Sequence, residues 1–375
     1  MRVIISAAGT GGHINPAIAI ANKIREKEPN SEIIFIGTNR GLENDLVPRA
    51  GYELKRIEAY GLKKEISINN LKHIFRTIRS SKEVKKIIDE FKPDLVVGTG
   101  GYICGPVFAA ATSKKVPAVL HESNAYPGKA VKMFAKEVDC VLVGFEEAKE
   151  RLKEAKKVVV TGNPTKIKNL NISQETKKKI LTELGVKNDL PVVLIFGGSQ
   201  GAQAINEATV ELIKSKLNEN YQIIWATGQN QYDIVKESFE NVDISIKNIK
   251  NVKVVPYIYN MEEMINIADL VICRSGAMTI TEIAICGKPA IFIPLPSRAA
   301  NRQEDNARVL EKLSAARIIL NNELTGKKLS EEIDSIVYDK SKLEEMGKLA
   351  TIIAPSDVEE KIYEEVKKIL LQKNK

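Results

Sequence analysis

Short runs of apolar residues alternate along the chain with segments whose apolar residues recur every three or four positions. The first pattern is typical of strands buried on both faces, and the second of amphipathic helices. We predict strands at residues 3–6, 32–36, 95–97, 118–120 and 140–143, and at 191–196, 222–226, 252–255, 270–273 and 290–294. Strands that alternate with helices in this way indicate an α/β fold with parallel sheets.

The same pattern starts twice. The strand at 3–6 leads into Gly9-Thr10-Gly11-Gly12 and a helical pattern at 16–24, and the strand at 191–196 leads into a glycine loop at 197–202 and a helix that ends at Ile213. Two doubly wound, Rossmann-like domains are the economical interpretation. The turn signal at residues 162–164 predicts domains at 1–162 and 163–357, and we expect the amphipathic segment 358–375 to pack back on the first domain.

Composition places the chain among globular proteins. Of its 375 residues 43% are hydrophobic and 28% charged, and no run approaches the roughly 18 apolar residues of a membrane span. The amino terminus lacks the pattern of a signal peptide. Four scattered cysteines without CxxC spacing predict reduced, buried thiols in a reducing compartment, and the three histidines show no metal-ligand spacing.

The positive charge is uneven. Residues 1–160 contain 27 Lys and Arg against 19 Asp and Glu, whereas residues 161–375 contain 29 of each. A basic first half favours an anionic partner such as nucleic acid, a membrane surface or a phosphorylated substrate. A lysine-rich solvated surface explains the composition equally well.

Both glycine loops are candidate phosphate sites. Glycine allows a close backbone approach, and amides that precede a helix bind anions. The dinucleotide fingerprint fails because it needs glycine at Ile14, and no Walker A ending is present. Either loop could therefore be only a tight turn.

A more specific signal follows the strand at 270–273. The segment from Arg274 to Glu282 opens a helix, so that amides near its start could bind a diphosphate and Glu282 could accept hydrogen bonds from a ribose diol. The alternative is a capped helix with an exposed glutamate. Polar side chains at 301–307 similarly suit sugar hydroxyls or a helix cap.

The first half contributes a candidate base. His13 begins a helix, where the imidazolium is disfavoured, and could remove a proton. His121-Glu122-Ser123-Asn124 is a second polar cluster. All these motifs lie at carboxyl ends of predicted strands, where open α/β sheets bind ligands. No Asp-x-Asp metal motif occurs, so amides and a helix dipole would have to neutralise a diphosphate, and we predict no metal and no cofactor.

Together these motifs resemble the MurG family, the UDP-N-acetylglucosamine–N-acetylmuramyl-(pentapeptide) pyrophosphoryl-undecaprenol N-acetylglucosamine transferases. Seven motifs occur in family order over nearly the whole chain: residues 9–17, 98–102, 121–124, 162–164, 197–202, 274–282 and 303–306. The resemblance implies a GT-B fold and inverting, metal-independent transfer of N-acetylglucosamine from UDP-N-acetylglucosamine to lipid I, giving lipid II. The first domain would take lipid I and the second UDP-N-acetylglucosamine.

The resemblance also implies roles for individual residues. His13 would be the catalytic base, and the substrate-binding residues would be Thr10, Gly11, Gly12, Asn124, Lys166, Ser199, Ile258, Ala277, Met278, Thr279, Glu282 and Gln303. Among these, Ser199 and the amides of 277–279 would hold the diphosphate, Glu282 the ribose, the Ile258 backbone the uracil, and Gln303 and Asn124 the sugar. The acceptor site would comprise Gly100, Gly101, Tyr102, His121 and Glu122.

Two positions depart from the family. Ser123 stands where the family usually has Gln, and Lys166 where it usually has Arg. Lysine keeps the charge but loses the bidentate fork of arginine, which weakens the expectation for Lys166.

Two rival functions keep the same fold. A UDP-N-acetylglucosamine 2-epimerase would share the UDP site but act on a soluble sugar, for which a basic, membrane-facing first domain has no use. A non-catalytic UDP-sugar-binding membrane protein is the other, and His13 and Gln303 argue against it.

A lipid-linked acceptor predicts an enzyme bound peripherally to the cytoplasmic face of the cell membrane, with no role for nucleic acid. Residues 55–86 hold ten basic and three acidic side chains. Leu71, Ile74, Phe75 and Ile78 share one helical face there, which predicts a patch for an anionic inner leaflet. The ordinary alternative is that this stripe packs into the domain core.

Overall fold

The computed structural model describes residues 1–60, 68–186, 190–198, 200–296 and 302–373, without the side chains of 68–78. It divides the chain into two compact units. The first unit comprises Met1–Lys166 and Pro355–Lys375, and the second comprises Ile167–Ala354. The sequence predicted domain borders at residues 162 and 357. The structure instead assigns the segment 163–166 to the first unit.

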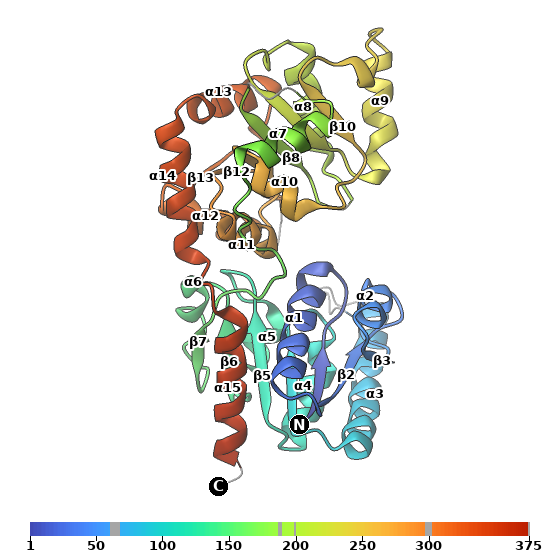
Figure 1. The fold of residues 1–375 in the computed structure, drawn as a ribbon. Helices are drawn as coiled ribbons and strands as arrows, with labels where there is room; N and C mark the ends of the chain where they lie inside the picture. Colours follow the sequence, from blue (N-terminus) through green and yellow to red (C-terminus); the bar gives the residue numbers. More distant parts are fainter. Residues whose placement is uncertain (61–67, 187–189, 199, 297–301, 374–375) are drawn as a thin grey trace. The chain divides into compact units, whose positions relative to one another are not determined.

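The first unit is built on a sheet of seven parallel strands in the order β3-β2-β1-β4-β5-β6-β7. Its strands are β1 (Arg2–Ser6), β2 (Glu32–Gly37), β3 (Glu53–Arg56), β4 (Leu95–Gly98), β5 (Ala118–Glu122), β6 (Cys140–Val143) and β7 (Val158–Val160). Its helices are α1 (Gly11–Lys27), α2 (Glu43–Arg49), α3 (Ile68–Phe91), α4 (Cys104–Ser113), α5 (Lys129–Phe134), α6 (Glu146–Lys149) and α15 (Val358–Lys373) (Figure 1).

The second unit repeats this design with six parallel strands in the order β10-β9-β8-β11-β12-β13. Its strands are β8 (Val192–Phe196), β9 (Gln222–Ala226), β10 (Val252–Val255), β11 (Leu270–Cys273), β12 (Ala290–Phe292) and β13 (Ala316–Ile318). Its α-helices are α7 (Gln174–Glu183), α8 (Gln203–Lys214), α9 (Tyr232–Glu240), α10 (Met261–Ile267), α11 (Ala277–Ile285), α12 (Arg302–Lys312), α13 (Gly326–Val337) and α14 (Lys340–Ala350). Short 3-10 turns lie at η1 (Gln229–Gln231), η2 (Ile246–Asn248) and η3 (Thr351–Ile353).

The predicted α/β fold is confirmed, and each predicted strand is present. Sequence reasoning missed β3, β7 and β13. β3 and β13 are short and hold charged residues such as Glu53 and Arg317, and β7 has only three residues. The helical pattern predicted at 16–24 lies within α1, which extends beyond it at both ends. The helix begins at Gly11 and tolerates the missing proline N–H inside its early turns.

Side chains alternate between the two faces of the first sheet, so they contribute to two separate hydrophobic cores. Ile4 packs with helices α3 and α4 on one face, whereas Val3 and Ile5 pack on the other face with α1. The second core also contains Val358, Ile362, Val366 and Ile369, so α15 covers the first sheet beside α1 (Figure 1). The last helix of the chain thus completes the core that the first strand begins.

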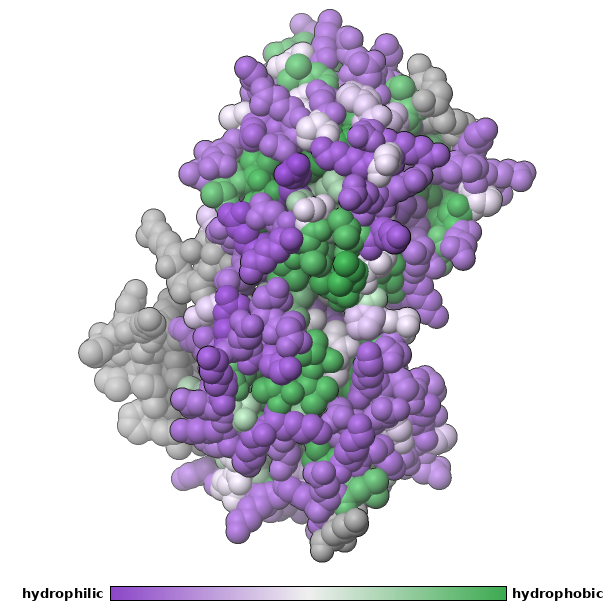
Figure 2. Space-filling view, turned by 90° about the vertical axis from the view of Figure 1, so that its left-hand side faces the viewer, coloured by the Kyte–Doolittle hydropathy of each residue, from purple (hydrophilic) through white to green (hydrophobic). Residues whose placement is uncertain are grey.

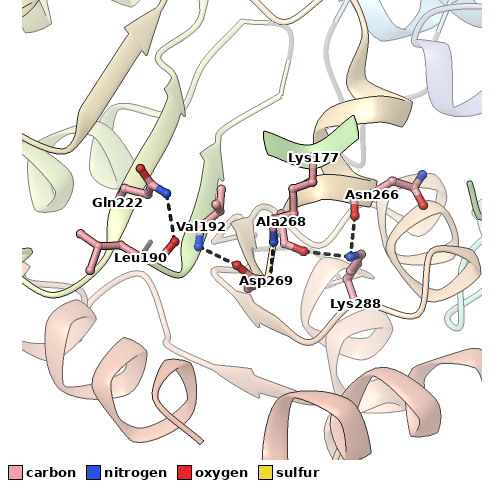
Figure 3. A network of polar contacts seen from close by, with 8 residues as sticks. All are labelled: Lys177, Leu190, Val192, Gln222, Asn266, Ala268, Asp269 and Lys288. Atoms are coloured by element: carbon pink, nitrogen blue, oxygen red, sulfur yellow. Dashed lines mark hydrogen bonds and ion pairs between the residues drawn. The ribbon is translucent and has the colours of Figure 1, made fainter. Parts of the chain in front are cut away.

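The amino ends of both sheets are fastened by an aspartate that precedes a central strand. In the first unit Asp94 accepts a hydrogen bond from the amide of Arg2 at 2.7 Å. In the second, Asp269 accepts one from the amide of Val192 at 2.8 Å and pairs with Lys177 at 2.8 Å (Figure 3). These contacts tie β1 to β4 and β8 to β11 at the edge opposite the glycine loops.

Lys288 fastens the same edge of the second unit. Its ammonium group donates to the carbonyl oxygens of Asn266 and Ala268, at 2.7 and 2.9 Å, at the end of helix α10 (Figure 3). Burial lowers the pKa of this lysine. A cation at a helix C-terminus satisfies carbonyls that lack an intrahelical partner.

Hydrophilic side chains surround smaller apolar areas on the face drawn in Figure 2. Exposed large apolar side chains include Met133 in the first unit and Tyr259 and Leu295 in the second. Leu295 matters below because it borders a cavity. The stripe Leu71, Ile74, Phe75 and Ile78 lies on α3 but outside the residues whose side chains are described, so neither of its interpretations is decided.

Within the described part of the chain, no helix combines the length and the apolar character that crossing a membrane requires.

The packing of α15 makes a prediction about stability. Ile362→Ala removes a side chain that is 1% exposed in the second core of the first unit, and should lower the free energy of unfolding by about 2–5 kcal/mol. Leu371→Ala on the same helix removes a side chain that is 61% exposed and should change it by less than about 0.5 kcal/mol. Urea unfolding measures both, and equal effects would show that α15 does not complete this core.

Candidate functional site

The glycine loop of the first unit joins β1 directly to helix α1. Gly9 has a φ of 97°, a conformation that L side chains rarely adopt, and the chain enters the helix at Gly11. Thr10 is the N-cap residue, and its side chain makes no capping hydrogen bond in the described structure. The first amides of α1 therefore lie at the carboxyl edge of the sheet, where they can donate hydrogen bonds to an anion.

His13 is held in one orientation by the loop after β4. Its Nδ1 lies 3.0 Å from the carbonyl oxygen of Thr99, and the Thr99 hydroxyl donates to the His13 carbonyl oxygen at 2.7 Å. A carbonyl oxygen only accepts, so Nδ1 carries the proton and the lone pair of the neutral ring is on Nε2. The tautomer suits a general base that acts through Nε2.

The ring of His13 also needs the glycine at position 100. Gly100 and Gly101 have φ values of 99° and 83°. A Cβ on Gly100 would lie 2.9 Å from His13 Nδ1, and one on Gly101 would lie 3.5 Å from His13 Cδ2. The motif thus provides room for the imidazole, and the half-buried Tyr102 follows it.

His121 and Glu122 lie inside the first unit. Burial lowers the pKa of the His121 imidazole, and its Nε2 lies 3.2 Å from the carbonyl oxygen of Gly162. The Glu122 carboxylate accepts hydrogen bonds from the amide and the side chain of Asn124, each at 2.9 Å, and from the Gly128 amide at 2.6 Å. Glu122 therefore orders the loop that presents Asn124, and a direct contact of His121 or Glu122 with an acceptor stays a prediction.

A cavity of about 600 Å³ opens at the carboxyl edge of the second sheet. Three helices, α8, α11 and α12, begin beside it, through Gln203, Gly276 and Gln303. The N-cap residues of α8 and α11 are Ala202 and Gly276, whose side chains cannot accept a hydrogen bond. Helix N-termini that converge without caps make this cavity a site for an anion.

Helix α11 brings the predicted diphosphate and ribose groups to one face. The amides of Ala277, Met278 and Thr279 precede the first intrahelical bond, in which Ile280 donates to Gly276 at 3.0 Å. Thr279 lines the cavity, and Glu282 follows three residues later on the same side of the helix. The predicted contact of Ser199 lies outside the described residues.

Gln303 is already engaged within the rim of the cavity. Its side-chain oxygen accepts from the Leu295 amide at 2.8 Å, and its backbone oxygen accepts from the Ser275 hydroxyl at 2.8 Å. The side-chain NH₂ is the part of Gln303 that remains to donate to a ligand oxygen. These bonds link the loops after β11 and β12 to the start of α12.

Arg274 is a cavity residue to which sequence reasoning assigned no role. Its Nη1 donates to the carbonyl oxygens of Ile293 and Pro294 and to the Asn321 side chain, at 3.0, 3.1 and 2.9 Å. The guanidinium therefore joins the carboxyl ends of β11, β12 and β13. Its position directly after a buried strand and before a Ser-Gly turn was the only sequence signal.

Two further predicted residues are not among those that line this cavity. Ile258 is buried after the carboxyl end of β10, between Tyr257 and the exposed Tyr259, whose rings meet edge to face with centroids 4.9 Å apart. Lys166 is exposed and ends the first stretch of the first unit. Among the described residues no group of three or more His, Cys, Asp or Glu side chains has the geometry of a metal site.

Comparison with known proteins places these sites in context. Residues 3–143 match the glycosyltransferase family 28 N-terminal domain, and residues 192–370 match its C-terminal domain. The UDP-N-acetylglucosamine--N-acetylmuramyl-(pentapeptide) pyrophosphoryl-undecaprenol N-acetylglucosamine transferase of Acetivibrio thermocellus is 45% identical over 374 residues, covering 100% of this chain and 99% of that protein.

Solved structures share the fold. The crystal structure of MurG from Acinetobacter baumannii superposes with a TM-score of 0.77 at 26% identity, covering 98% of this chain and 99% of that one. A putative UDP-N-acetylglucosamine 2-epimerase from Listeria monocytogenes reaches a TM-score of 0.67 at 15% identity, covering 98% and 95%. The second likeness concerns the fold alone.

The fit between His13 and Gly100 can be tested without any ligand. In Gly100→Ala the new Cβ should displace the imidazole and destabilise the protein by roughly 1–3 kcal/mol, because alanine is strained at this φ. The chain has three histidines, so the imidazole NMR signals can be followed individually. The signal of His13 should shift while that of His121 stays.

Gly105→Ala is the matched control, since nothing lies within 4 Å of its added Cβ. It should leave all imidazole signals in place. An unchanged His13 signal in Gly100→Ala would contradict the packing of the ring against this loop.

Proposed function

The chain belongs to glycosyltransferase family 28, and on that premise we propose that it transfers N-acetylglucosamine from UDP-N-acetylglucosamine to the C4 hydroxyl of N-acetylmuramic acid in lipid I. The product is lipid II, for peptidoglycan synthesis. The observation that carries the proposal is the 45% identity, over all of this chain, to a protein named for that transfer. The geometry of the two carboxyl edges supports it.

The second unit is the proposed donor site. The uncapped amides of α8 and α11 bind the diphosphate and take the place of a metal ion, which the reaction does not need. Glu282 binds the ribose diol, Gln303 the sugar, and the backbone at Ile258 the uracil. Ser199 also holds the diphosphate, and Lys166 stays a predicted substrate-binding residue.

The first unit is the proposed acceptor site, with Thr10, Gly11 and Gly12 at the reacting end. The acceptor hydroxyl attacks the anomeric carbon from the side opposite UDP, which inverts the configuration. His13 Nε2 takes the hydroxyl proton as the new bond forms, and the electron pair of the broken bond leaves with UDP. Helix N-termini stabilise the charge that develops on the leaving diphosphate.

The rival functions are not favoured. Epimerases share the fold at 15% identity, whereas the full-length relationship is to a transferase. A non-catalytic sugar-binding protein has no use for a histidine whose tautomer is fixed by Thr99.

We place the enzyme peripherally on the cytoplasmic face of the membrane, on an anionic inner leaflet. The support is the lipid-linked acceptor and the excess of positive charge in residues 1–160. Nucleic acid has no part in the proposed reaction.

One experiment tests the function and the location together. The enzyme is incubated with labelled UDP-N-acetylglucosamine and a lipid I analogue in vesicles with or without anionic lipid, and products are identified by mass spectrometry. We expect a lipid-linked disaccharide and more enzyme sedimenting with anionic vesicles, less so at high salt. Release of a free epimerised sugar, or no product, would overturn the proposal.

Glu282→Ala should weaken UDP binding by about 1.5–3 kcal/mol, because a charged hydrogen-bond acceptor is lost from the ribose site. Isothermal titration with UDP measures this without the acceptor. Glu237→Ala, an exposed glutamate on α9, is the control and should bind UDP as the wild type does. Unchanged affinity in Glu282→Ala would remove this residue from the donor site.

His13→Ala should bind UDP normally, because the donor site belongs to the other unit, yet turn over about 10²–10⁴-fold more slowly. Steady-state kinetics with the lipid I analogue provides the rate. Near-normal turnover would mean that another group, or none, removes the proton.

A further inference from the structure

Glu43 is a buried carboxylate that the proposed mechanism does not use. It is the first residue of α2, and its side chain is 0% exposed. It accepts hydrogen bonds from the Gly9 amide at 2.9 Å, the Thr38 amide at 3.0 Å and the Thr38 hydroxyl at 2.7 Å. One oxygen holds the glycine loop after β1, and the other holds the loop after β2.

The chemistry of these contacts requires the ionised form. All three partners donate, and a carboxylate accepts at both oxygens. A protonated acid would instead place its own O–H donor next to one of these N–H or O–H donors. Burial alone would raise the pKa of the Glu43 carboxyl, but the hydrogen bonds from Gly9 and Thr38 outweigh it and lower the pKa below its usual value. The three hydrogen bonds therefore favour the charged form of Glu43.

The two loops touch closely around this carboxylate. The Leu42 amide donates to the Gly9 carbonyl oxygen at 3.2 Å, so that Gly9 is held through both its N–H and its C=O. Gly41 must be glycine here, because a Cβ would lie 2.0 Å from a Glu43 oxygen and 2.8 Å from the Gly9 nitrogen. A buried anion that bridges two loops fixes their relative position.

Only three residues separate this anchor from the proposed base. After Gly9 comes Thr10, whose carbonyl oxygen accepts from the amide of His13 at 3.0 Å. Thr99 holds the imidazole from the other side. The placement of Nε2 therefore depends on Glu43 at one end of the loop and on Thr99 at the other.

We propose that Glu43 is a positioning residue for the transfer reaction: through the Gly9 amide it fixes residues 9–12 and so places His13 and the loop amides against the acceptor. This rests on the proposed function of the first unit. Glu43 touches no substrate. It raises turnover by holding the groups that do, since a displacement of about 1 Å at a reacting group can cost on the order of 100-fold in rate.

Glu43→Gln is the sharpest test because it keeps size and shape. The amide oxygen can still accept from the two Thr38 donors, which leaves the NH₂ facing the Gly9 N–H, so that this one contact is lost. Asp139→Asn is the matched control. Asp139 accepts from the Ala118 amide at 2.9 Å at the opposite edge of the same sheet.

Three quantities are measured on the full-length enzyme. In Glu43→Gln, hydrogen exchange of a peptide covering residues 7–14 should be about tenfold faster or more, and kcat should fall roughly 10- to 100-fold. The Kd for UDP and the KM for UDP-N-acetylglucosamine should change less than about twofold. Asp139→Asn should share any loss of thermal stability but keep the exchange rate and kcat of the wild type.

The outcomes are distinct. Normal kcat in a folded Glu43→Gln enzyme overturns the proposal, and so does an equal fall of kcat in the control. If Glu43→Gln does not fold, Thr38→Val replaces it, since it removes one donor and should lower kcat in the same direction. Wild-type turnover in Thr38→Val would then overturn the proposal. If the wild-type enzyme makes no lipid-linked product, the proposed function itself fails, while the exchange rates still report whether Glu43 orders the loop.

Discussion

Both units depend on the same local geometry at the end of a buried parallel strand. The chain turns at a glycine and enters a helix, and the N-cap side chain of that helix makes no capping hydrogen bond in the described structure. In the first unit this sequence is β1, Gly9 and α1, and in the second it is β8, Gly198 and α8. The positive φ of each glycine lets the helix start close to the end of the strand. These amides then gather at the carboxyl edge of each sheet, and in the proposed function a diphosphate or a developing negative charge satisfies them.

At the opposite edge of each sheet, where the strands begin, polar groups stabilise the fold instead. Asp94, Asp139 and Asp269 each accept an amide hydrogen bond at the amino end of a neighbouring strand, and Lys288 satisfies carbonyls at the end of α10. Polar groups there are paired within the protein. At the carboxyl edges the amides of α1, α8 and α11 are left for ligands. This division explains how one chain can hold rigid sheets and still present unsatisfied donors.

The fold alone does not decide the reaction. Epimerases and transferases share two such sheets, so the side chains at the carboxyl edges decide which reaction is catalysed. In the first unit the proposed groups are His13, with its tautomer set by Thr99, and Gly100, which makes room for its ring. Glu43 belongs to the same arrangement, because an enzyme that moves a proton at a loop must keep that loop in one place.

The sequence by itself determined the alternation of strands and helices, the two units and the candidate motifs, because hydrophobic period and glycine placement are local properties of the chain. It did not reveal β3 or β13, whose charged residues break the apolar pattern, or the three-residue strand β7. Nor did it reveal the roles of the half-buried Arg274 and the buried Glu43, because charged residues are expected at the surface until their partners are known. Glu43 meets Gly9 across 34 positions and His13 meets Thr99 across 86, and only tertiary structure brings such distant donors and acceptors to hydrogen-bonding distance.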